Sequence, residues 1–159
     1  MEQWYKKHPE IQDLEKKAMK NVWPSAKYCY LPSGDAGWIV RVRPIINGEH
    51  REWIFLIKYP FDHPSIESSI KCYPIKPNYY ELQKIVDTSN ITPKTIPFVH
   101  YDIDNNMYFP ICKEDGDKKY IIRHADVALA MACRWITVFE LGLTDQATWT
   151  LFQKKPMWE

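Results

Sequence analysis

Hydrophobic and polar residues follow helical and strand patterns over much of this chain. Residues 9–20 repeat apolar side chains at helical spacing, and Pro9 suits the first turn of a helix. Segments that alternate apolar and polar residues then predict four strands, at residues 27–31, 38–46, 53–58 and 69–73. The Asn47-Gly48 pair predicts a hairpin turn between the second and third of these strands. The simplest arrangement is a four-stranded antiparallel meander.

The second half of the chain has a different pattern. After Tyr73, about fifty residues lack a sustained period, apart from a short helical segment at 79–86, and such long irregular stretches are often functional loops. Order returns at residue 125, where two apolar stripes predict a central helix: Ala125, Ala128, Leu129, Ala132, Ile136 and Phe139 in one, Val127, Met131, Trp135 and Val138 in the other. Gly142 is expected to cap this helix, and Thr144-Asp145 to begin a last helix ending at Phe152. We therefore expect a single α+β domain spanning residues 1–159.

Composition and charge narrow the possible functions. The 21 basic and 20 acidic residues leave a net charge of +1, so there is no basic footprint for a nucleic-acid partner. The N-terminus lacks the apolar run of a signal peptide, and no stretch approaches a membrane span, which predicts a cytoplasmic protein without a membrane partner. The four cysteines form no CxxC pair, which argues against a zinc ribbon or a disulfide framework. No pair of histidines or cysteines has metal-ligand spacing, so we expect neither a metal nor a cofactor.

Cys112 is the strongest candidate for chemistry. It follows the apolar residues 109–111, which can anchor the backbone, and precedes the polar residues 113–117, so its thiol is expected to be accessible. The other interpretation is a small apolar side chain packed beneath the loop. Core packing explains the remaining cysteines, which lie in predicted strands or the central helix: Cys29, Cys72 and Cys133.

The order of these elements resembles the ubiquitin-conjugating enzyme fold, with an N-terminal helix, a four-stranded meander, a long active-site loop and central and C-terminal helices. Residues 59–64, Tyr-Pro-Phe-Asp-His-Pro, look like the YPxxPP turn of that family. His100, twelve residues before Cys112, resembles the histidine that opens the HPN motif. Ile111-Cys112 resembles the family's Ile-Cys pair, and Glu114 stands where an acidic residue often follows. The resemblance covers roughly residues 5–142.

The resemblance implies acyl transfer, in which a cysteine carries a polypeptide C-terminus as a thioester and a lysine amine then attacks it. A free cysteine is about 3% thiolate at pH 7, which suffices for an activated donor. His100 would pin the loop, and Glu114, Asp115 or Asp117 would orient the lysine. Each of these acidic residues is also explained as part of a solvated loop.

The sequence departs from the family at the HPN motif, because it reads His100-Tyr101-Asp102. Asp102 cannot donate a hydrogen bond while ionised, so the resemblance leaves oxyanion support to the side-chain amide of Asn105 or Asn106. The same Asn-Asn pair is first of all a turn signal.

This departure and the tryptophan-rich ends resemble a divergent bacterial branch of the family, the conjugating proteins of type II cyclic-oligonucleotide-based anti-phage signalling (CBASS) operons. That likeness implies a cGAS-like nucleotidyltransferase as the donor, a lysine-bearing acceptor, and a separate adenylating enzyme as a possible activating partner. The alternative is a catalytically inactive protein-binding module of the same fold, since the HPN asparagine is missing. An aromatic-rich RNA-binding domain is disfavoured by the near-neutral charge.

Overall fold

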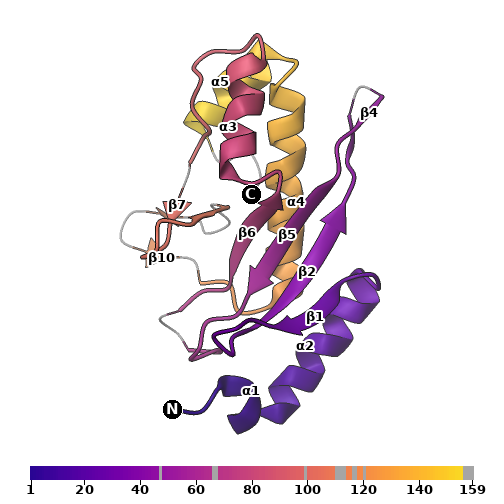
Figure 1. Ribbon diagram of the computed structural model, residues 1–159, viewed down its shortest axis with the longest axis vertical. Coiled ribbons are helices and arrows are strands. Elements are labelled where there is room, and N and C mark those ends of the chain that lie inside the picture. The colour runs from indigo at the N-terminus through magenta and orange to yellow at the C-terminus, as the bar shows by residue number, and fades with distance from the viewer. Residues whose placement is uncertain are drawn as a thin grey trace.

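A four-stranded antiparallel sheet forms the centre of the molecule, in the order β1-β2-β5-β6 (Figure 1). The computed structural model describes residues 1–46, 48–65, 68–98, 100–109, 114–115, 118–119 and 121–155, and of residues 49, 50, 114, 115, 118 and 119 it describes only the backbone. The strands are β1 (Lys27–Tyr30), β2 (Ala36–Val42), β5 (Trp53–Lys58) and β6 (Lys71–Lys76). The predicted meander is confirmed, although β6 begins and ends later than the sequence pattern indicated.

Alternation along the strands separates a core face from an outer face. On β2, Trp38 and Val40 are buried, whereas Arg41 is exposed. Val40 pairs with Phe55 of β5, which is also buried, so the two strands present apolar side chains to the same core. The period of two that predicted these strands therefore also identifies their buried face.

The prediction of one continuous strand over residues 38–46 is wrong. β2 ends at Val42, and the chain resumes as the short β3 (Ile45–Ile46), which pairs with β4 (Glu49–His50). Pro44 lies at the break, and proline has no N–H to donate to a neighbouring strand. Gly48 has a φ of 77°, in the left-handed region expected for a hairpin turn, while Asn47 lies outside the described residues.

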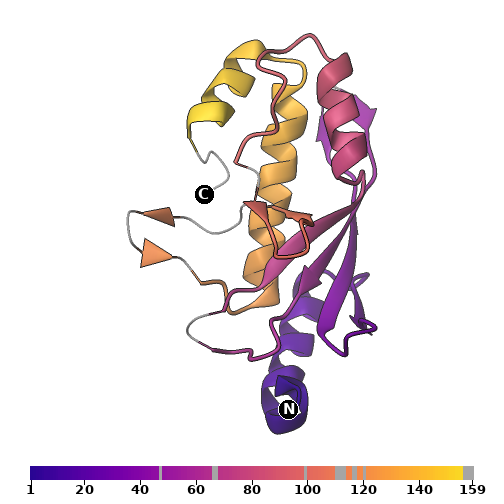
Figure 2. The ribbon, with the colours of Figure 1, turned by 60° about the vertical axis from the view of Figure 1, so that its left-hand side comes forward.

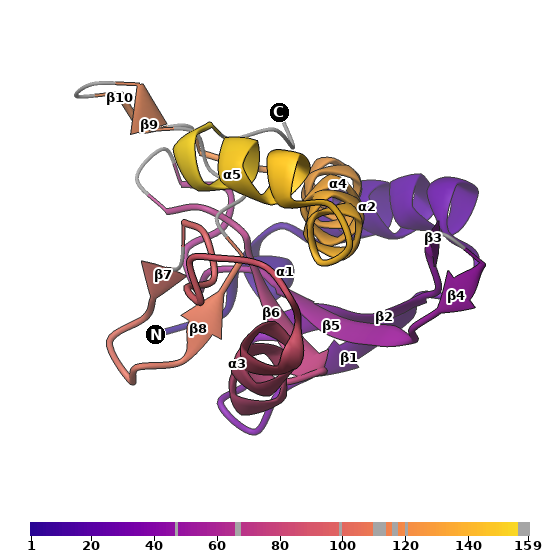
Figure 3. The same ribbon diagram turned by 90° about the horizontal axis from the view of Figure 1, so that it is seen from above.

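A helical layer lies on one side of the sheet. It contains α2 (Pro9–Val22), α4 (Ala125–Gly142) and α5 (Gln146–Lys154), and α4 packs on β5 and β6 and also contacts α2 and α5, which lie toward its opposite ends (Figures 1 and 3). The first predicted stripe of α4 is wholly buried, and Trp135 of the second stripe is buried with it. Val127 of the second stripe is exposed, so this face of α4 turns partly toward solvent. The short α1 (Trp4–Lys7) precedes α2 and buries Trp4 in the same core.

The helix predicted over residues 9–20 is confirmed, and a charged side chain lies on its mainly apolar buried face. α2 starts at Pro9 and buries Met19 together with Glu15, whereas Leu14 is largely exposed. The carboxylate of Glu15 accepts a hydrogen bond of 3.1 Å from the N–H of Ala125, the first residue of α4. A buried carboxylate with such a partner replaces the apolar side chain expected on this face.

Gly142 does not cap α4 as the sequence predicted. Gly142 is the last residue of the helix, and Leu143 follows it as the C-terminal cap. A Cβ atom at Gly142 would lie 2.9 Å from Cε3 of Trp149 on α5, so close packing between the helices explains the glycine. The expected start of the last helix is confirmed, since the side chain of Asp145 accepts the N–H of Ala147.

The segment between β6 and α4 is more regular than predicted. It contains α3 (Tyr79–Thr88), which begins with a capping box between Asn78 and Glu81. Two short hairpins follow, formed by β7 (His100–Tyr101) with β8 (Met107–Tyr108) and by β9 (Glu114–Asp115) with β10 (Lys118–Lys119). Figure 2 shows the β9–β10 hairpin standing away from α4, whereas β8 packs against β6.

Among the residues that the structure describes, no helix combines the length and the apolar character needed to cross a membrane.

Candidate functional site

The sequence nominates seven candidates for the chemistry, and the structure describes three of them completely. Cys112 lies outside the described residues, as does Asp117, so the accessibility of the thiol stays a prediction. Glu114 and Asp115 form β9, but their side chains are not described. The grouping of carboxylates around Cys112 is therefore also still a prediction.

The other three candidates lie on the β7–β8 hairpin, which precedes Cys112 in the chain. His100 pairs with Tyr108, and Tyr101 pairs with Met107. Asn105 sits in the connecting turn with a φ of 60°, a left-handed conformation that asparagine tolerates better than most residues. The left-handed conformation of the turn therefore explains why an asparagine occupies position 105.

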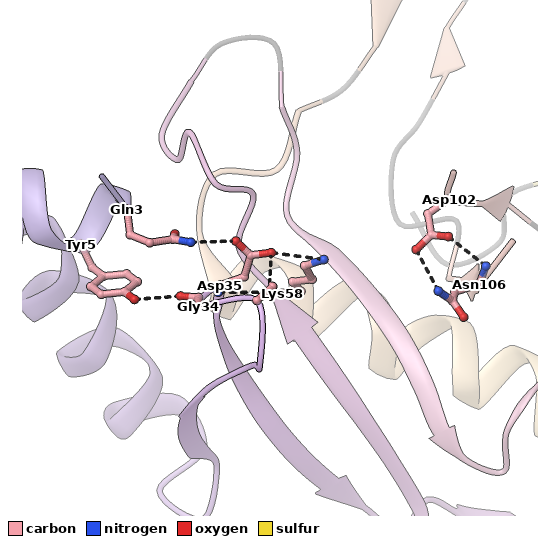
Figure 4. A network of polar contacts seen from close by, with 8 residues as sticks. Gln3, Tyr5, Gly34, Asp35, Lys58, Asp102 and Asn106 are labelled. Carbon is pink, nitrogen blue, oxygen red and sulfur yellow. Dashed lines mark hydrogen bonds and ion pairs between the residues drawn. The ribbon is translucent and has the colours of Figure 1, made fainter. Parts of the chain in front are cut away.

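The Asp102 carboxylate organises this turn. Its Oδ1 accepts hydrogen bonds of 2.9 Å from the N–H groups of Asp104 and Asn106. Its Oδ2 accepts the side-chain amide of Asn106 at 3.4 Å (Figure 4). Asn106 is one of the two asparagines suggested for oxyanion support, and its side-chain amide is hydrogen-bonded inside the turn.

The environment of Asp102 keeps its carboxylate ionised. Partial burial alone would raise the pKa of Asp102, but hydrogen bonds from Asn106, Asp104 and the Tyr73 hydroxyl hold it below its usual value. An ionised carboxylate accepts hydrogen bonds and cannot donate one. Asp102 therefore fixes the turn and has no proton for an oxyanion.

The ring of His100 stacks on a tyrosine ring, and a lysine ammonium also lies against that tyrosine. Its ring lies 5.6 Å from that of Tyr108, with the planes 21° apart. The Lys71 ammonium lies 4.9 Å from the centroid of the same tyrosine ring, within cation–π range. This packing is consistent with the expectation that His100 holds the loop.

Phe109 anchors the end of the hairpin in the core. It is fully buried, and its N–H donates a 2.8 Å hydrogen bond to the carbonyl of Cys72 on β6. Its ring lies 4.8 Å from that of Trp135 on α4 and 6.3 Å from that of Trp53 on β5. Phe109 is the third residue before Cys112 in the sequence, and it supplies the apolar anchor expected there.

The three cysteines that the structure describes are poor nucleophiles. Cys72 is fully buried, and burial raises the pKa of Cys29. Burial also raises the pKa of Cys133 to about 11, so that thiol is almost entirely protonated at neutral pH. The predicted role in core packing is confirmed for Cys72 and Cys133, whereas Cys29 is half-buried on β1 and is not part of the core.

The sequence pattern did not indicate the buried carboxylate of Glu15 where α2 meets α4. Besides the Ala125 bond, Glu15 lies 3.5 Å from the ring of His124, and burial raises the pKa of Glu15. One signal was available: Glu15 lies four residues from both Ile11 and Met19, so it shares their helix face. A charged residue on a mainly apolar face indicates a buried partner.

His63, in the proline-bearing turn of residues 59–64, packs among aromatic rings. It is 3% exposed, and its ring lies 4.7 Å from that of Trp4 and 4.9 Å from that of Tyr59. Burial, together with the smaller effect of the nearby His124, lowers the pKa of His63 to about 4. The imidazole is therefore neutral at physiological pH.

A surface hollow of about 610 Å³ lies between the N-terminal segment and the same turn, and Trp4, Lys7, Phe61 and His63 are among its lining residues. No group of three or more His, Cys, Asp or Glu side chains within the described ranges is arranged to hold a metal ion.

No family model, curated protein or solved structure matches this chain.

Proposed function

We propose that this protein is an acyl carrier of the ubiquitin-conjugating type, with Cys112 as its thioester-forming residue. The observation that carries the proposal is the path of the chain toward this cysteine. A four-stranded meander is followed by a hairpin that starts at His100. The hairpin ends at the buried Phe109, which is the third residue before Cys112 in the sequence. This order of elements supports the resemblance stated from the sequence.

The reaction has two steps. The Cys112 thiolate attacks the carbonyl carbon of an activated C-terminus, so that a C–S bond forms and the bond to the leaving group breaks. A lysine amine then attacks the thioester, the amide C–N bond forms, and Cys112 leaves as a thiolate. The proton lost by the amine passes to water or to a neighbouring carboxylate such as Glu114.

The donor and the setting follow from the narrower likeness to bacterial anti-phage conjugating proteins. The donor would be the C-terminus of a cGAS-like nucleotidyltransferase in the cytoplasm, and an adenylating enzyme would activate it. The acceptor would be a lysine-bearing protein. A nucleotidyltransferase gene and an effector gene beside this one would support this assignment.

A synthetic peptide thioester of mercaptoethanesulfonate tests the chemistry without the natural donor. The protein is incubated with this probe, and intact mass spectrometry measures the adduct. We expect one adduct on Cys112 that dithiothreitol releases and that Cys112→Ala abolishes. Transfer of the same acyl group to added lysine completes the test.

Cys133→Ala is the matched control, because it removes a thiol whose raised pKa already keeps it unreactive. The adduct should persist in this variant. An adduct that survives Cys112→Ala, or a wild-type protein that forms none, would contradict the proposal.

The second candidate is a protein-binding module without catalysis. Two observations favour it: the Asn106 amide is engaged by Asp102, and a hollow of about 610 Å³ lies beside α1. Failure of Cys112 to react with iodoacetamide in the folded protein would select this candidate.

A further inference from the structure

We propose that Asp102 is a positioning residue, which holds the β7–β8 hairpin in the arrangement that acyl transfer requires. This inference rests on the proposed function, because the reaction that Asp102 would assist is the transfer through Cys112. The inference is based on the hydrogen-bond donors that converge on the Asp102 carboxylate. It is also based on two hydrogen bonds that join the hairpin to β6.

The carboxylate closes the turn from inside. Oδ1 accepts the N–H groups of Asp104 and Asn106, and Oδ2 accepts the Asn106 amide. Two backbone bonds of 3.0 Å complete the turn, from Asp102 N–H to the Asn106 carbonyl and from Asn105 N–H to the Asp102 carbonyl. Residues 102–106 are therefore fixed mainly by one side chain.

The turn and the exit of the hairpin are attached to adjacent residues of β6. The Tyr73 hydroxyl donates to the Asp102 carboxylate, and the Cys72 carbonyl accepts the Phe109 N–H at 2.8 Å. Cys72 and Tyr73 pair in turn with Ile57 and Leu56 of β5. The turn and the exit of the hairpin are thus each hydrogen-bonded to β6, and Asp102 makes one of these two bonds.

The donors explain why this position carries an aspartate. Three N–H groups and one hydroxyl point at the side chain, and a carboxylate offers two oxygens with about four acceptor sites. An asparagine would offer one oxygen, and its NH₂ group would face donors. The departure from the HPN pattern therefore matches the surroundings of Asp102.

Three substitutions of Asp102 separate acceptor geometry from charge. Asp102→Asn keeps one acceptor oxygen without charge, Asp102→Glu keeps the charge but moves the oxygens by one methylene, and Asp102→Ala removes both. Asp104→Asn is the matched control, because the Asp104 side chain is exposed on the same turn. Each variant is loaded with the peptide thioester, and transfer to added lysine is followed in a single turnover.

If Asp102 positions the hairpin, Asp102→Ala and Asp102→Glu should slow transfer about tenfold or more, and Asp102→Asn should slow it only a few-fold. Alkylation of Cys112 by iodoacetamide, which needs only an accessible thiolate, should stay within about twofold of wild type. Amide hydrogen exchange at Asp104 and Asn106 should accelerate in the slow variants. Asp104→Asn should leave all three measurements unchanged.

Tyr73→Phe tests the same attachment by a substitution that should leave the fold intact. It removes one hydroxyl and keeps the ring, whose centroid lies 5.9 Å from that of Tyr108. A slowing of transfer of about twofold to threefold is expected, with unchanged alkylation. Wild-type transfer rates in all Asp102 variants would overturn the inference and leave the proposed function standing. Full activity of Asp102→Glu with an inactive Asp102→Asn would also overturn it, because charge would then matter and geometry would not. A wild-type protein that forms no adduct would overturn the proposed function itself, and this inference with it.

Discussion

Glu15, His63 and Asp102 each carry a titratable group into a partly or fully buried position, and each has different surroundings. Glu15 accepts the first N–H of α4, so its carboxylate lies at a helix N-terminus, where negative charge is favoured. Asp102 collects donors from its own turn. His63 lies among aromatic rings and a neighbouring histidine, which disfavour its charged form.

These surroundings predict how stability depends on pH. The pKa of His63 is about 4 in the folded protein, against 6.5 when unperturbed. Between these values the unfolded chain binds more protons, so the free energy of unfolding should fall as the pH drops from 6.5 to 4, by up to about 3 kcal/mol. Glu15 acts in the opposite direction, because its raised pKa disfavours the ionised form on folding, and stability is lost as the pH rises through that pKa.

His63→Phe isolates the histidine contribution, because the ring is kept and cannot be charged. Urea denaturation at several pH values should show a flatter profile between pH 4 and 6.5 than in wild type. His8→Gln is the control, since His8 is exposed, and its profile should follow that of wild type. An unchanged slope in His63→Phe would contradict the prediction.

At the scale of elements, α5 holds an irregular segment of the chain, residues 92–95, through three side chains. The Gln146 side chain exchanges two hydrogen bonds with the backbone of Thr92, at 2.9 and 2.6 Å. The Trp149 indole N–H donates to the Pro93 carbonyl, and the Gln153 amide donates to the Thr95 carbonyl, both at 2.9 Å. Residues 92–95 lie outside the sheet, and α5 satisfies their backbone groups in place of a strand.

Gln146→Ala should destabilise the protein by about 1–2 kcal/mol, because it leaves both polar groups of Thr92 without these partners. Hydrogen exchange at the Thr92 amide should accelerate more than exchange in the sheet. Leu151→Ala, at an exposed position of the same helix, serves as the control and should cost less. Equal effects of the two substitutions would argue against the contact.

Gly142 fixes how closely α4 and α5 approach. Alanine is the better helix former by about 1 kcal/mol, yet the added Cβ would lie 2.9 Å from the Trp149 ring and 3.4 Å from its Cα. We expect Gly142→Ala to lower the free energy of unfolding by about 1–3 kcal/mol, measured in urea. A variant more stable than wild type would contradict this prediction and would mean that the Trp149 ring moves aside at little energetic cost.

Across the whole molecule, Phe109 joins the sheet to the helical layer. Its ring contacts Phe55 and Trp53 on β5 and Trp135 on α4, and Trp135 contacts Phe152 on α5. Phe109 is therefore one of the fully buried residues that tie the long segment after β6 into the core, together with Leu82 and Val86 of α3. Phe109 also carries the chain toward Cys112.

Phe109→Ala should destabilise the whole protein by about 3–5 kcal/mol, whereas Phe109→Leu should cost distinctly less because it keeps most of the volume. Urea denaturation followed by far-UV circular dichroism and by tryptophan fluorescence should give coincident transitions in both variants. A loss confined to the fluorescence signal would mean that Phe109 stabilises only its own segment.

The sequence by itself determined the elements whose pattern reports burial on one face: the α2 helix, the meander, and the buried stripe of α4. Local chemistry also identified the Asp145 cap, whereas the resemblance to the family singled out His100 and the two asparagines, which the structure places on one hairpin. Such features depend on residues a few positions apart, which a periodic pattern records.

Only the tertiary structure decided which polar groups meet across long separations. Glu15 accepts from Ala125, 110 residues away, and Phe109 donates to Cys72 on a strand that precedes it. The sequence pattern predicted a helix cap at Gly142, whereas in the structure Trp149 occupies the space where a side chain at this position would lie. Hydrogen bonding and close packing depend on distances in space, and a one-dimensional pattern of hydrophobicity contains no such distances.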